Sequence, residues 1–150
     1  MTTRIEHRIG VAAPADVIWD LVADVEGWKA WNPLYPEARG RIGIGETLHL
    51  TENVPGKPPR AIQPVVFDWE PNSQILWRTG GMLSKTVRYI EIEALSETGC
   101  IFANGAFFHG LLGEQEARSA RRAIFGGYQQ LGEAVKQLSE QRWREQGAAK

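Results

Sequence analysis

The longest helical pattern in this chain comes last, after a series of short strand-like segments. From Gly113 to Arg142, apolar residues recur every three or four positions, which is the spacing of one helix face. Residues 37–109 form short apolar runs that glycine and proline interrupt. Strands followed by one long amphipathic helix predict an α+β fold in which a curved sheet covers that helix. Because a curved sheet and a helix rarely fill all the space between them, we expect a pocket there.

The composition narrows the classes of protein that this chain can belong to. With 150 residues, it is long enough to bury a substantial core, and we expect a single domain over residues 1–150. The formal net charge is −1 and acidic and basic residues are interspersed, so a nucleic-acid partner is not expected. There is neither a transmembrane run nor an apolar leader, and Cys100 is the only cysteine, which makes a reducing cytoplasm the simplest location.

Neither a metal nor a cofactor is predicted. A lone cysteine excludes a cysteine-based zinc site, and the three histidines do not have the spacing of metal ligands. The pair Gly43 and Gly45 lacks the third glycine and the strand–turn–helix context of a nucleotide-binding loop. The expected partner is a small hydrophobic ligand.

The order of elements is predicted as one strand, two short helices, six strands and the long helix. The first strand ends near Val11, one helix follows Pro14 and ends near Val22, and a second short helix or turn contains Trp28 and Trp31 and ends at Asn32-Pro33. The later strands are expected near Ile42 and over residues 47–51, 61–70, 74–79, 86–94 and 100–108. A kink is expected at Gly126-Gly127, since glycine weakens a helix interior.

Several segments in this order match a known pattern. They are residues 13–24, residues 28–33, the hairpin of residues 71–78, residues 108–112 and the final amphipathic helix. Taken together, they are similar to the START-type helix-grip superfamily, or SRPBCC, and in particular to its polyketide cyclase/dehydrase-like branch. The resemblance implies a seven-stranded curved antiparallel sheet around the last helix, with a ligand cavity between them. It does not imply a reaction, because that superfamily holds binding proteins, lipid carriers, chaperone cofactors and a minority of enzymes.

Alternation along the strands predicts which side chains line the cavity. Glu91 and Glu93 should face water, which turns Arg88, Ile90 and Ile92 inward. The same reasoning, applied to the other strands and to the helix, predicts a ligand-binding set: Trp31, Leu48, Leu50, Trp77, Arg88, Ile90, Phe102, Asn104, Phe108, Phe125 and Tyr128.

Three polar residues are candidates for catalysis. Arg88 either reaches water at the cavity mouth, or meets an acid or a ligand carboxylate. Asn104 either bonds neighbouring backbone or water, or orients a ligand oxygen. His109 is either a surface residue or a general base at the pocket edge. Gly105 is expected to mark a bulge, which would turn Phe107 and His109 inward.

Three functions stay open from the sequence. The first is binding of a small hydrophobic or aromatic ligand, with access controlled by residues 53–60 and 80–84. The second is a cyclase or dehydrase that acts on a polyketide-like substrate. The third is a protein-interaction module that assists another protein, as the chaperone-cofactor relatives do, which an exposed apolar patch outside the cavity would favour. Trp143 lies beyond the apolar stripe, where it is exposed or makes the contact of a homodimer.

Overall fold

Two antiparallel sheets form the framework of the protein. The structure is a computed structural model that describes residues 2–148. The larger sheet has five strands in the order β1 (Thr2–Val11), β8 (Gly99–His109), β7 (Lys85–Ser96), β6 (Gln74–Gly80) and β5 (Val65–Glu70). The smaller sheet has three strands, β2 (Glu37–Arg39), β3 (His49–Glu52) and β4 (Arg60–Ile62).

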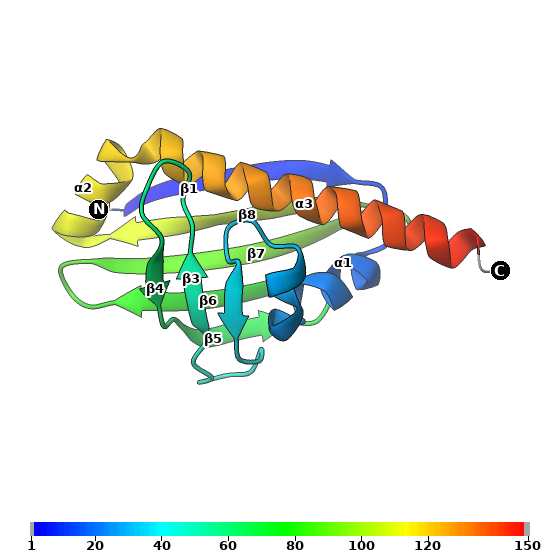
Figure 1. Ribbon diagram of the computed structural model, residues 1–150, viewed down its shortest axis with the longest axis horizontal. Helices are drawn as coiled ribbons and strands as arrows, with labels where there is room; N and C mark the ends of the chain where they lie inside the picture. Colours follow the sequence, from blue (N-terminus) through cyan, green and yellow to red (C-terminus); the bar gives the residue numbers. More distant parts are fainter. Residues whose placement is uncertain (1, 149–150) are drawn as a thin grey trace.

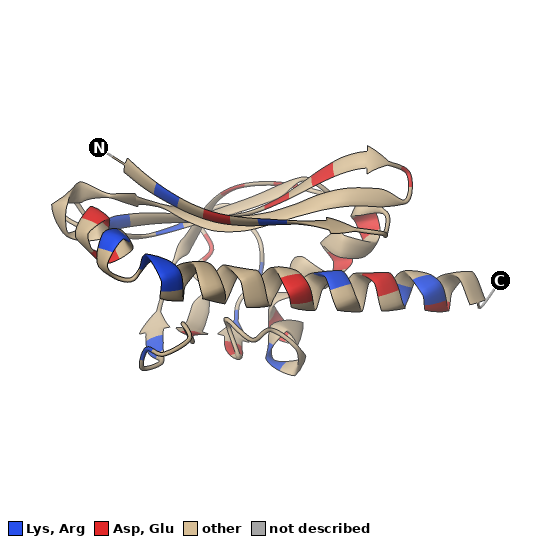
Figure 2. Ribbon diagram, turned by 90° about the horizontal axis from the view of Figure 1, so that it is seen from above, with Lys and Arg blue, Asp and Glu red and all other residues tan. Residues whose placement is uncertain are grey.

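The helices and the small sheet lie on one side of the large sheet. Helix α1 (Ala15–Val22) and the 3₁₀ helix η1 (Val25–Ala30) follow β1, while α2 (Gly110–Ser119) and α3 (Arg121–Ala148) close the chain. Helix α3 runs along β1 and β8, and the small sheet lies next to it over the other half of the same face (Figure 1). The view from above shows the opposite face of the large sheet uncovered (Figure 2). The continuous apolar core lies on the covered face.

The predicted fold class is confirmed, but the strand count differs. A single sheet of seven strands was expected, whereas the structure has eight strands in two sheets. The predicted strand over residues 61–70 is interrupted at Gln63 and Pro64, because proline has no N–H to donate to a ladder. A single bridge between Thr47 and Val65 joins the small sheet to the edge of the large one.

The C-terminal helical region also differs from the prediction. Instead of one helix with a kink at Gly126-Gly127, two helices are separated at Ala120, and α3 is unbroken through both glycines. At the break, the Glu116 carbonyl accepts both the Ala120 N–H at 3.0 Å and the Ser119 hydroxyl at 3.3 Å, and the Ala120 backbone leaves helical geometry, with φ −116° and ψ 19°. Gly127 instead permits close packing, since a Cβ there would lie 3.0 Å from Leu34 Cδ1.

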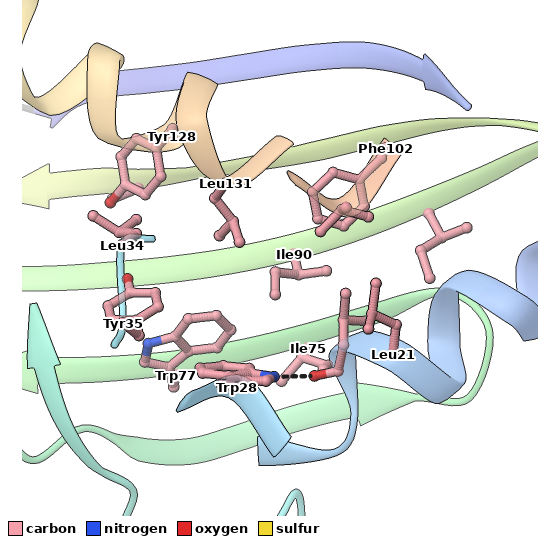
Figure 3. Close-up of a cluster of buried hydrophobic side chains, with 14 of the residues drawn as sticks. Leu21, Trp28, Leu34, Tyr35, Ile75, Trp77, Ile90, Phe102, Tyr128 and Leu131 are labelled. Carbon is pink, nitrogen blue, oxygen red and sulfur yellow. Dashed lines mark hydrogen bonds between the residues drawn. The ribbon is translucent and has the colours of Figure 1, made fainter. Parts of the chain in front are cut away.

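The helix nevertheless packs as predicted. Tyr128, Leu131 and Val135 are all buried against the sheet. They join one continuous apolar core with Phe102 and Ile90 of the large sheet (Figure 3). None of the helices within residues 2–148 combines the length and apolarity needed to cross a membrane.

An aromatic cluster packs between η1 and the large sheet. Trp28 of η1 packs against Tyr35 and Trp77, and its Nε1 donates a hydrogen bond to the Val22 carbonyl at 3.1 Å (Figure 3). Trp28 and Trp77 are each 1 % exposed. These rings therefore belong to the core and anchor the first helices to the sheet.

Candidate functional site

A cavity of about 230 Å³ lies between the two sheets and the helices α2 and α3. Its lining comes from the segment between η1 and β2, from β3, β4 and the loop between them, from β7 and β8, and from both helices. The apolar part of the wall is made by Leu34, Val54, Pro58, Phe108, Ala120, Ile124 and the ring of Tyr128. The charged part is made by Glu52, Lys57, Arg60, Arg88 and Glu116. The cavity thus combines an apolar wall with one concentrated group of charges.

The centre of that charged group is a buried ion pair between the two sheets. Arg88 of β7 donates from Nε to Glu52 Oε2 at 2.9 Å and from Nη2 to Glu52 Oε1 at 3.2 Å. Both side chains are almost fully buried. Two further groups complete the site: the Tyr35 hydroxyl donates to Glu52 at 3.3 Å, and Arg88 Nη1 donates to the Thr79 hydroxyl at 2.9 Å. Such additional bonds offset the cost of removing the two charges from water.

The ion pair keeps both groups charged. Burial alone would raise the pKa of Glu52, but Arg88 and Arg60 outweigh it and the pKa is lowered. Burial alone would lower the pKa of Arg88, but Glu52 outweighs it and the pKa is raised. Glu52 is therefore engaged as a carboxylate and is not a free general base.

A second ion pair crosses the mouth of the cavity. Arg60, at the start of β4, donates to Glu52 Oε1 at 3.0 Å and to Glu116 Oε1 of α2 at 3.1 Å. The Arg60 side chain is 49 % exposed, so solvent screens this link more than the inner one. Arg60 therefore connects the start of β4 to α2 where the cavity wall reaches solvent.

Two neutral residues shape the inner wall. The Asn32 Oδ1 accepts hydrogen bonds from the backbone N–H groups of Leu34 and Tyr35, at 3.0 and 2.9 Å, and so places Leu34 at the cavity. Tyr128 faces Leu34 from α3 (Figure 3). Burial raises the pKa of the Tyr128 hydroxyl even though Arg88 opposes the shift. Tyr128 is thus neutral near pH 7 and retains its proton.

The direction of the Glu52 shift predicts how stability depends on pH. Because its pKa in the folded protein lies below the ordinary value of 4.5, Glu52 contributes stability that is fully present above about pH 4.5. That contribution is lost as the pH falls through the folded value. We measure the free energy of unfolding in urea at a series of pH values. Below pH 4.5, we expect it to fall less steeply with decreasing pH in the Glu52→Gln/Arg88→Met double variant than in the wild type. An acid slope equal to that of the wild type would contradict this role.

The structure brings only part of the predicted ligand-binding set to the cavity. Arg88, Phe108 and Tyr128 lie on its wall. Six others are buried in the core on the same side of the large sheet: Leu48, Leu50, Trp77, Ile90, Phe102 and Asn104. Trp31 is partly buried against that core. Phe125 is 39 % exposed and packs on His7, because it lies on the side of α3 that faces the edge strand β1.

The other two catalytic candidates do not share the cavity with Arg88. Asn104 donates from Nδ2 to the Tyr128 carbonyl at 2.9 Å, so it joins β8 to α3. His109 bonds the Thr2 hydroxyl at 3.0 Å, on the opposite side of the strand from Phe108. The bulge expected at Gly105 is absent, and β8 pairs without interruption on both sides of it. A side chain at Gly105 would collide with the Ile5 carbonyl, so glycine there allows close strand approach.

Glu52 is not among the residues predicted from the sequence, although the chain contains a pattern that indicates its position. Glu52 has the same parity as Leu48 and Leu50, which places it on the inward face. Arg60 and Glu116 have no comparable pattern, since they meet only when the β3–β4 loop approaches α2. Of the two predicted access loops, residues 53–60 line the cavity, whereas residues 80–84 pack on the start of α2. Within residues 2–148, no group of three His, Cys, Asp or Glu side chains has a metal-binding arrangement.

Comparison with known proteins yields one family match. The sequence model of the family described as polyketide cyclase / dehydrase and lipid transport matches residues 2–140. No curated protein matches the chain at a significant level.

Several solved structures are similar to this one. The Zhui aromatase/cyclase from Streptomyces sp. R1128 has a TM-score of 0.76 and 22 % identity, with 95 % of this chain and 96 % of that chain covered. A norcoclaurine synthase from Thalictrum flavum has a TM-score of 0.70 and 18 % identity, with 95 % and 96 % covered. A START superfamily protein from Mycobacterium smegmatis has a TM-score of 0.57 and 19 % identity, with 85 % and 98 % covered. At these identities, the likeness extends to the fold alone.

Proposed function

This chain belongs to the polyketide cyclase / dehydrase and lipid transport family, and from that premise we propose that it binds a small, largely apolar or aromatic molecule in the cavity between its sheets and its C-terminal helices. The observation that carries the proposal is the cavity wall itself. Apolar side chains make up most of this wall, and the charged group around Arg88 makes up much of the rest. Sites for small organic molecules have this composition, in which apolar surface supplies affinity and a few polar groups supply orientation.

The charges favour a ligand that has an oxygen atom at one end. Arg88 uses three of the five N–H donors that a guanidinium offers, two toward Glu52 and one toward Thr79. The remaining donors are available for a carbonyl, phenol or carboxylate oxygen. Tyr128 retains a proton on the same cavity wall and is a second donor. A ring-shaped ligand with a carbonyl or acidic group fits this arrangement.

Catalysis on a polyketide-like substrate is a second candidate function. It is supported by the two donors, Arg88 and Tyr128, which are suited to polarise a carbonyl group held in the cavity. One of the similar structures is named an aromatase/cyclase, which is consistent with chemistry of this kind. Glu52 is paired with two arginines and is therefore a poor base for removing a proton from a substrate. The cavity lining is better suited to polarising a substrate carbonyl group.

Two naphthalene derivatives of matched size test the binding proposal. Naphthalene-2-carboxamide and 2-naphthoate differ in charge but hardly in shape. Titration calorimetry should detect both, and Ile124→Trp should weaken both by at least about tenfold, because the larger side chain projects into the cavity. Arg88→Met should weaken 2-naphthoate by about a further tenfold relative to the amide, the value of one charge-assisted hydrogen bond.

The control for this experiment is Gln129→Trp, which adds the same side chain to the exposed face of α3. It should leave both affinities unchanged. If neither compound binds, or if Ile124→Trp binds as the wild type does, the cavity is not a site for ligands of this class. Equal losses for the two compounds in Arg88→Met would assign Arg88 a structural role only.

A further inference from the structure

An apolar patch lies at one end of the molecule, outside the cavity. Within residues 2–148, seven large apolar side chains are exposed, and four of them come from two adjacent turns. Met82 is 98 % exposed and Leu83 65 %, in the turn between β6 and β7. Leu111 is 72 % exposed and Leu112 52 %, in the first turn of α2. Exposed apolar side chains that gather in this way indicate a surface that contacts something apolar.

The two turns are held together as one surface. The Leu112 N–H donates a hydrogen bond to the Leu83 carbonyl at 3.0 Å. Gly110 makes this approach possible: its φ is +83°, and a Cβ there would collide with the Leu83 backbone. We call these four residues, Met82, Leu83, Leu111 and Leu112, the apolar tip.

Basic residues outnumber acidic residues in the segments that carry and flank the apolar tip. The segments 53–60, 81–85 and 110–122, which form this end of the molecule, contain six Lys or Arg and two Glu, in a chain whose net charge is −1. Glu114 is buried, and Glu116 pairs with Arg60. Arg118, Arg121 and Arg122 are exposed, and none of the ion pairs among residues 2–148 engages them. Figure 2 shows basic residues where α2 meets α3.

We propose that this end of the protein docks onto an anionic phospholipid surface, with the apolar tip inserted among the lipid headgroups and acyl chains. Aliphatic side chains on protruding turns, next to exposed arginines, have the composition of interfacial membrane-binding segments. The cavity mouth is close by, because Glu116 at the mouth is one helical turn from Leu112. Docking in this orientation places the entrance of the cavity next to the membrane.

The composition of the tip favours lipid over a protein partner. Leucine is under-represented among the residues that dominate protein interfaces, whereas three of the four side chains of the apolar tip are leucines and none is aromatic. Its most exposed residue, Met82, stands on a turn and not on a flat face. Basic residues next to an anionic membrane each contribute about fivefold to affinity. Arg118, Arg121 and Arg122 would therefore each strengthen binding to such a surface.

Co-sedimentation with vesicles tests this proposal without any cavity ligand, so its outcome is separate from that of the binding experiment above. The probes are vesicles of phosphatidylcholine alone and of phosphatidylcholine with an equal part of phosphatidylglycerol. We expect binding to the anionic vesicles that weakens at high salt. The Met82→Asp/Leu83→Asp double variant should lose at least about tenfold in affinity, since it removes the inserted side chains. The Arg118→Gln/Arg121→Gln/Arg122→Gln variant should bind both kinds of vesicle with similar, weak affinity.

The matched control is Leu95→Asp, because Leu95 is 64 % exposed on the β7–β8 hairpin at the other end of the strands. It should bind vesicles as the wild type does. The proposal is overturned if the wild type does not bind anionic vesicles, or if the double variant binds them equally well. It is also overturned if sedimentation velocity finds a dimer that the double variant disrupts, which would assign the apolar tip to a second copy of the chain.

Discussion

Replacing Glu52 by glutamine is expected to lower the free energy of unfolding by about 3 kcal/mol or more, which is a large part of the stability of an ordinary domain. The change leaves the Arg88 guanidinium buried without a counter-ion. It also weakens the link between β3 in the small sheet and β7 in the large sheet, which these two side chains join directly. Urea unfolding followed by tryptophan fluorescence measures the effect.

Two further variants separate the buried charge from general effects of substitution. Glu37→Gln changes an exposed acid of the same small sheet and should alter stability by less than about 0.5 kcal/mol. The Glu52→Gln/Arg88→Met double variant should regain part of the loss, because it removes the uncompensated charge. If Glu52→Gln and Glu37→Gln have equal stability, the buried ion pair does not contribute as the geometry indicates.

The second large effect is expected on the C-terminal helix. Val135→Asp should destabilise the protein by more than about 3 kcal/mol, since it places a carboxylate where the side chain is fully buried. Thermal unfolding measured by circular dichroism should show either a much lower Tm or no cooperative transition. This result would show that α3 is part of the core and not an appendage.

Gln137→Asp is the matched control for this helix. It introduces the same side chain two residues away, on the exposed face of α3. Its Tm should stay within a few degrees of the wild-type value, because exposed substitutions of this kind change the free energy of unfolding by about 0.5 kcal/mol or less. A Val135→Asp variant as stable as Gln137→Asp would contradict the packing of α3 on the sheet.

The apolar tip bears on one of the functions that the sequence left open. An exposed apolar patch was the feature expected to favour a protein-interaction module, and the structure has such a patch near the cavity, which we assign instead to a phospholipid surface. Docking and ligand binding are compatible, because Glu116 and Leu112 lie on the same helix. A membrane next to the mouth would let an apolar ligand enter without crossing water.

Several features of the protein follow from the sequence by itself. The periodicity from Ile124 to Val135 predicts the buried face of α3, since an apolar stripe at helical spacing has to meet the core. Alternation along residues 86–94 predicts that Arg88 turns inward, because successive side chains of a strand point to opposite faces. Both patterns are local, so they predict the fold class without knowledge of the tertiary contacts.

Only the tertiary structure decides what Arg88 meets. Its partner Glu52 is 36 residues away, and Arg60 and Glu116 join the group from a loop edge and a separate helix. The division of the strands into two sheets and the break at Ala120 set those positions. Local patterns predict the direction of a side chain, whereas a cavity is the space left between elements. Its lining therefore depends on packing angles and loop paths that no single segment encodes.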